Sequence, residues 1–127
     1  MKRFLDRNAD YFYFAFRVII GLVFLLHGIM KLPGMFAGTT PVMSLIFLAG
    51  IIETVGGALL ILGLFTRSVA CISAIEMVFA YFMAHASRGW SPLANNGEPA
   101  VLFFAAFLVL AAFGAGRWAL DNLKRRR

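Results

Sequence analysis

Four long apolar runs constrain this sequence more than any other feature. The hydrocarbon core of a bilayer is about 30 Å thick, and an α-helix needs about 20 apolar residues to cross it. The four runs that approach this length are residues 11–32, 44–65, 68–87 and 99–118. They are continuous and lack the in/out alternation of an outer-membrane β-strand. The sequence therefore predicts an all-α integral membrane four-helix bundle, built as a single domain over residues 1–127.

The composition excludes the other broad classes of protein. Of the 127 residues, 61% are hydrophobic and 14% are charged, whereas soluble domains have about 45–50% apolar and about 25% charged residues. A soluble domain this small could not bury that much apolar surface. Cys71 is the single cysteine, which excludes an internal disulfide and a C-x-x-C dithiol pair.

The basic residues predict the orientation of the chain. If the N-terminus is inside, nine Lys and Arg residues flank the inner ends of the four runs and two flank the outer ends. The inner set is Lys2, Arg3, Arg7, Arg67, Arg117 and Lys124–Arg127, and the outer set is Lys31 and Arg88. Cytoplasmic loops carry the excess of positive charge, so both termini are predicted to be cytoplasmic. The net charge of +6 is explained by these membrane flanks, and no nucleic-acid partner is expected.

Three charged residues lie well inside the apolar runs and are the candidate ligand or proton site. Glu53 and Glu76 fall near the middle of the second and third runs, and Arg17 lies in the first. Charges at this depth are costly unless they are paired or hydrated, so Arg17 is expected to pair with Glu76, with Glu53 or with both. One Arg cannot neutralise two carboxylates, so one Glu is expected to be protonated. The alternative is a buried network that only fixes the register of the helices.

These charges share helical faces with small residues. With the spacing of an α-helix, the stripes are Arg17, Gly21, Phe24, Gly28 and Lys31; Gly50, Glu53, Gly56, Gly57 and Gly63; and Ser73, Glu76, Ala80 and Ser87. Small residues allow membrane helices to approach closely. The three stripes are therefore predicted to face the interior of the bundle.

Four further polar residues are predicted to lie on the outer side of the membrane. They are His27, Lys31, His85 and Glu98. Two histidines without further ligands do not make a metal site, and no haem-attachment motif such as C-x-x-C-H is present. We expect these residues to form hydrogen bonds near the outer surface, with no bound metal and no covalently bound cofactor.

The order of motifs resembles the DoxX family of small four-helix membrane proteins over about residues 14–121. FRVIIGLVFLLHGIMKL is similar to the R-x-x-x-G and G-x-x-K motifs of the first helix, and GIIETVGGALLILGLFTR is similar to the E-x-x-G-G and T-R motifs of the second. NNGEPAVLF and GAGRWALD resemble the motifs around the fourth helix. Ala115 stands where the family pattern has Pro.

The resemblance implies a prokaryotic inner (plasma) membrane protein associated with a respiratory or a thiol- or sulfur-linked oxidoreductase. A quinone-type pocket would then lie beside Arg17, Glu53 and Glu76, because a quinone needs hydrogen-bond donors and a proton source next to an apolar cleft. The expected partners are the lipid bilayer and either further copies of the chain or a redox protein that supplies electrons. Two alternatives remain: a non-catalytic membrane anchor or scaffold for a soluble redox enzyme, and a small proton-coupled transporter.

Overall fold

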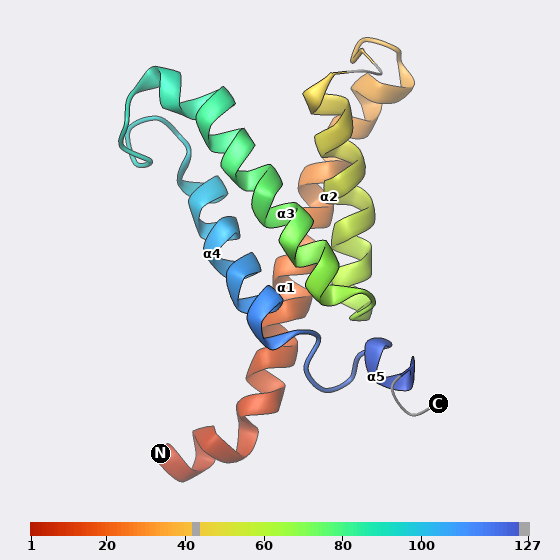
Figure 1. The fold of residues 1–127 in the computed structure, drawn as a ribbon, viewed down its shortest axis with the longest axis vertical. Helices are drawn as coiled ribbons and strands as arrows, with labels where there is room; N and C mark the ends of the chain where they lie inside the picture. The colour runs from red at the N-terminus through yellow and green to blue at the C-terminus, as the bar shows by residue number, and fades with distance from the viewer. Residues whose placement is uncertain (42–43, 125–127) are drawn as a thin grey trace.

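The computed structural model describes residues 1–41 and 44–124, and all of its regular elements are helical (Figure 1). The elements are α1 (Lys2–Phe36), α2 (Leu45–Leu62), α3 (Thr66–Ala80), a π-helical turn (Tyr81–His85), a 3-10 turn (Ala86–Arg88), α4 (Glu98–Phe113) and α5 (Asp121–Lys124). No strand occurs within the described ranges. The predicted all-α class is confirmed. Arg125–Arg127 of the predicted basic flank lie outside the described residues.

Three of these helical segments are long and apolar enough to cross a membrane. They are α1, α2 and α3 together with its continuation to Arg88. The fourth, α4, is apolar but has only 16 residues. It ends at Phe113, whereas the predicted span continues to Trp118. Gly114 and Gly116 follow with φ angles of 76° and 69°, a conformation that ends a helix and favours glycine.

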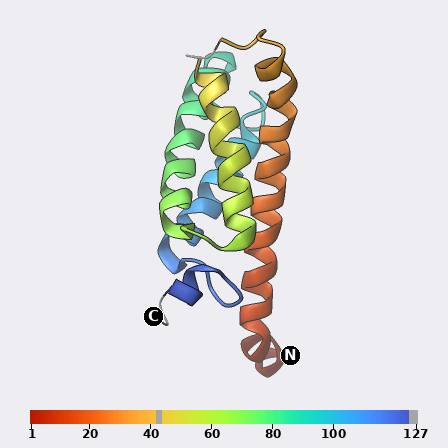
Figure 2. The ribbon, with the colours of Figure 1, turned by 90° about the vertical axis from the view of Figure 1, so that its right-hand side faces the viewer.

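The helices pack mainly as two pairs, α1 with α2 and α3 with α4, and α2 contacts α3 between the pairs. Figures 1 and 2 show the start of α1 and the short helix α5 at the same end of the bundle, which we call the terminal end. The N-terminal part of α1 projects beyond the other helices there (Figure 1). The first and the last described helices therefore have their outer ends on one side of the bundle.

Glycines set the close approach of α1 and α2. A Cβ atom at Gly57 would stand 2.5 Å from the backbone nitrogen of Leu25, and one at Gly21 would stand 3.0 Å from the carbonyl oxygen of Gly57. Real Cβ atoms do not come so near to backbone atoms, so glycine is required at this contact. The packing of small residues replaces hydrophobic driving force between membrane helices.

The predicted interior stripes are confirmed on the first two helices. The buried residues of α1 are Arg17, Gly21, Phe24 and Gly28, and those of α2 are Gly50, Glu53, Gly56, Gly57 and Leu60. On the third helix Ser73 is buried, but Ser87 is exposed. The regular helical register does not reach Ser87, because the π-helical turn at Tyr81–His85 rotates the chain before it.

Candidate functional site

Arg17 is fully buried near the terminal end of the bundle, where backbone carbonyl groups bind it. Its guanidinium donates hydrogen bonds to the carbonyl oxygens of Ala115, of Trp118 at 2.9 Å and of Arg117 at 3.3 Å. Its Nε atom is buried and has no hydrogen-bond partner among the residues that the structure describes. These acceptors lie in the segment that follows α4, about a hundred positions away in the chain.

The predicted pairing of Arg17 with Glu76 or Glu53 is wrong. Arg17 lies beside the end of α2, because a Cβ atom at Gly63 would stand 3.0 Å from its Cζ atom. Glu53 lies almost three helical turns further along α2, about 15 Å away at 1.5 Å per residue. The structure puts Arg17 level with the end of α2 and with the segment after α4, whereas the prediction paired it with carboxylates near the middle of the second and third helices.

Residues 114–121, which we call the C-terminal strap, are held against three helices. The Tyr13 hydroxyl donates to the carbonyl oxygen of Gly114 at 2.6 Å. The Asp121 carboxylate accepts from the backbone N–H groups of Phe65 at 2.7 Å and Thr66 at 3.0 Å, so it caps the start of α3. Arg17 is thus one of several groups that hold the strap, and its role here is structural.

A second charged cluster, which we call the charged triad, consists of Lys31, Glu53 and Glu76. The Lys31 ammonium forms an ion pair with Glu53 Oε2, and the side chains are 29% and 7% exposed. Lys31 was predicted as an outer-side polar residue on the interior stripe of the first helix, without a carboxylate partner. Its long side chain reaches the carboxylate of Glu53 on α2. This pairing could have been predicted, because both residues lie on the interior stripes of adjacent helices.

Glu76 is the member of the charged triad whose bonding capacity is not filled. Its side chain is half-buried, and its Oε2 atom is buried without a hydrogen-bond partner in the described part of the chain. The charges of Glu53 and Lys31 both act on it. One ammonium therefore faces two carboxylates, and Glu76 Oε2 remains available to a proton, a water molecule or a ligand.

The two histidines bond different backbone groups in the described structure. His27 Nδ1 lies 2.9 Å from the carbonyl oxygen of Val23 on its own helix, and His85 Nδ1 lies 3.2 Å from that of Asn95. Glu98 is exposed in the first turn of α4. Among the described residues, no group of three His, Cys, Asp or Glu side chains could hold a metal ion.

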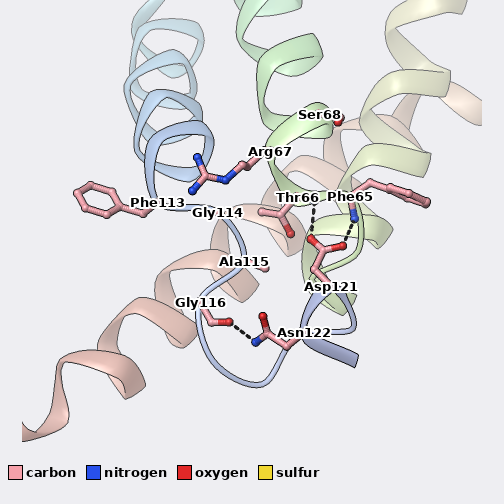
Figure 3. Close-up of a pocket in the computed structure, with 10 residues that line it drawn as sticks. All are labelled: Phe65, Thr66, Arg67, Ser68, Phe113, Gly114, Ala115, Gly116, Asp121 and Asn122. Atoms are coloured by element: carbon pink, nitrogen blue, oxygen red, sulfur yellow. Dashed lines mark hydrogen bonds between the residues drawn. The ribbon is translucent and has the colours of Figure 1, made fainter. Parts of the chain in front are cut away.

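Two cavities lie away from the charged triad. The larger, about 460 Å³, is at the terminal end between the start of α3, the end of α4 and the strap (Figure 3). The smaller, about 170 Å³, lies between α3 and α4 and is lined by Met77, Val78, Tyr81, Phe82, Ala100, Val101 and Phe104. Its wall is almost entirely apolar, so lipid chains or an apolar ligand tail suit it.

Apolar helices of this length, with charges buried between them, define a small multi-pass membrane protein. The sequence profile of the DoxX family matches residues 12–86. The chain therefore belongs to the DoxX family, and the resemblance found in the sequence motifs is confirmed.

Three bacterial relatives are similar over most of the chain. An uncharacterized protein of Haemophilus influenzae is 41% identical over 93% of this chain and 94% of its own length. A Bacillus subtilis protein with the name "Putative oxidoreductase CatD" is 32% identical over 83% of this chain and 81% of its own. An uncharacterized membrane protein of Mycobacterium tuberculosis is 30% identical over 87% and 80%. No solved structure is significantly similar to the chain.

Proposed function

We propose that the chain is a membrane subunit of a respiratory or a thiol- or sulfur-linked oxidoreductase, and that the charged triad binds the head group of a quinone-type ligand. The observation that carries this proposal is Glu76 Oε2, a buried oxygen without a partner in the described chain. The B. subtilis relative, which carries the name "Putative oxidoreductase CatD", supports the redox class.

The chemistry of the charged triad suits a quinone. Reduction of a quinone to a quinol adds two electrons and two protons to its carbonyl oxygens. The Lys31 ammonium can donate a hydrogen bond to one carbonyl, and a protonated Glu76 can donate a hydrogen bond and then one proton. In this proposal the second proton comes from water, which reprotonates Glu76 between the two transfers. The chain holds no redox-centre motif, so in this proposal a partner redox protein supplies both electrons. We place the complex in the inner membrane of a bacterium, since the relatives are bacterial.

The test is binding of a short-chain photoreactive quinone to the purified protein in detergent. We expect crosslinks near Glu76, and about tenfold weaker binding in Glu76→Gln, which corresponds to about 1.4 kcal/mol. Gln keeps the size of Glu but cannot give or take a proton. Glu98→Gln is the matched control, because Glu98 is an exposed carboxylate outside the charged triad. Equal binding by all three proteins, or no binding by the folded wild type, would contradict the proposal.

A second candidate function is the anchor or scaffold, and one observation favours it. The start of α1 projects beyond the bundle at the terminal end (Figure 1) and exposes Lys2, Arg3 and Arg7 together with Phe4 and Leu5. A soluble redox enzyme could dock there. The anchor function would be supported if the full-length protein recruits the partner enzyme, if deletion of residues 2–7 abolishes this recruitment, and if the protein binds no quinone. Proton uptake through Glu76 without quinone binding would instead support the transporter.

A further inference from the structure

We infer that the cavity at the terminal end binds the phosphate group of a membrane phospholipid, with Arg67 as the residue that recognises it. This cavity is separate from the charged triad, and the inference does not depend on the proposed function. The cavity measures about 460 Å³ and is formed by the start of α3, the end of α4, the strap and the start of α5. Figure 3 shows the side chains that line it.

Arg67 is fixed in position but keeps donors for a ligand. Its Nη1 atom donates to the carbonyl oxygens of Ala111 and Ala112 at 2.8 Å each, at the end of α4. Its guanidinium lies along Gly114, where a Cβ atom would stand 3.1 Å from Nε and 3.5 Å from Nη2. Nε and Nη2 take no part in these two bonds. A planar guanidinium with two free donor nitrogens is the preferred protein ligand of a phosphate group.

A second, independent observation is the hydroxyl of Thr66. This side chain is completely buried on the wall of the cavity, and its Oγ1 atom has no hydrogen-bond partner in the described residues. Buried hydroxyl groups are nearly always hydrogen-bonded. Because the side chain is 0% exposed, no water molecule fits against Oγ1 in this structure, and a phosphate oxygen would become its partner once the side chain turns toward the cavity.

The carboxylate of Asp121 lies in the same cavity but does not make it acidic. Both of its oxygens accept backbone N–H groups, from Phe65 at 2.7 Å and from Thr66 at 3.0 Å. The positive end of the α3 helix dipole also compensates its charge. The guanidinium of Arg67 is therefore the group with charge left to offer to an incoming anion.

The rim of the cavity indicates a lipid in place of a soluble phosphate. Phe65 and Phe113 flank the opening, and 53% and 73% of their surfaces are exposed. They stand at the ends of membrane helices, where an acyl chain would run beside them. Arg67 is in the first turn of α3, so its guanidinium lies at the level where the phosphates of a leaflet are found.

The test is native mass spectrometry of the purified protein titrated with phosphatidylglycerol in detergent. We expect the wild type to retain one lipid that Arg67→Gln binds about tenfold more weakly. Arg117→Gln is the matched control, because Arg117 is an exposed arginine at the same end that pairs with Asp10. Since Arg67 also bonds the end of α4, a second variant is needed. Ser68→Trp leaves Arg67 in place, fills the cavity and should also displace the lipid.

Two results would overturn the inference. One is equal lipid retention by the wild type and by folded Arg67→Gln and Ser68→Trp proteins. The other is competition by a soluble phosphate. If glycerol 3-phosphate displaces the bound lipid at the concentration at which added phosphatidylglycerol does, the cavity binds a soluble phosphate and not a lipid. A melting curve for each variant shows that the protein compared is folded.

Discussion

Arg17 and Glu76 are both ionisable groups in the interior of a membrane bundle, but their surroundings differ. Arg17 is held by three carbonyl oxygens of residues 115–118. Glu76 has a buried oxygen that no described residue bonds. Arg17 also has one donor, Nε, without a partner among the described residues, but its other nitrogens bind three backbone carbonyls and so hold the fold. Glu76 Oε2 is not tied to any described residue in this way, so it is available for chemistry. The comparison separates a structural end of the bundle from a candidate functional middle.

The largest effect is expected when Arg17 is removed. Arg17→Ala removes the donor to the carbonyl groups of Ala115, which is buried, and of Trp118. Because an unpaired buried polar group costs about 1–3 kcal/mol, we expect the free energy of unfolding to fall by about 3 kcal/mol. Unfolding in mixed detergent micelles measures this. Arg117→Ala, at an exposed site, should change stability by less than about 1 kcal/mol.

The double variant Arg17→Ala/Glu76→Ala then decides whether the two regions are independent. If Arg17 paired with Glu76, as the sequence predicted, the second substitution would restore much of the lost stability. The structure predicts that the two changes are additive within about 0.5 kcal/mol. If Glu76→Ala restores much of the stability lost in Arg17→Ala, the surroundings of Arg17 and of Glu76 are not independent, and the contrast between them is wrong.

The next effect concerns the satisfied part of the charged triad. Lys31→Ala leaves the buried carboxylate of Glu53 without its ammonium, and we expect a loss of about 2 kcal/mol. This is below the cost of breaking a fully dry pair, because the Lys31 side chain is 29% exposed. Lys31→Ala/Glu53→Ala should recover most of the loss in the same assay. A single variant as stable as the wild type would show that this ion pair is hydrated.

A smaller effect is expected at the cap of α3. Asp121→Ala removes the acceptor for the N–H groups of Phe65 and Thr66, and the loss of a helix cap costs about 1 kcal/mol. Asp121→Asn keeps one acceptor oxygen and should lose less. Exchange of these two backbone hydrogens, followed by mass spectrometry, checks the local cause.

The smallest effect on stability is expected for Glu76→Gln. Because Glu76 Oε2 has no partner in the described chain, its loss should change the free energy of unfolding by less than about 0.5 kcal/mol. Binding of the photoreactive quinone should nevertheless weaken. A large loss of stability would place Glu76 with Arg17 among the structural charges and remove the contrast.

Much of the fold could be predicted because its signals are local. Gly21, Gly28 and Gly57 repeat at helical spacing beside the charged residues, and the structure buries all three. The end of α4 was also signalled, by the glycines at 114 and 116, but the apolar run continued past them. Apolar length alone does not place a helix end where glycines with positive φ follow.

The partner of Arg17 could not be predicted, because backbone carbonyls carry no residue-specific signal. Every residue has one, and those of Ala115 and Trp118 become acceptors only when the chain after α4 turns back. Counting side-chain charges therefore assigned Arg17 to carboxylates. Lys31 was placed at the outer boundary for a different reason. Its depth was estimated from its position along the helix, and the reach of its long side chain was not considered.

The bonds of the strap also set the order in which the molecule can be completed. Arg17 is synthesised about a hundred residues before its acceptors at Ala115–Trp118. Until those residues have left the ribosome, the guanidinium on the first helix lacks these acceptors, and the helix cannot take its final position. Nascent chains arrested before Ala115 should therefore stay sensitive to protease, and resistance should appear once the strap has been synthesised and has left the ribosome.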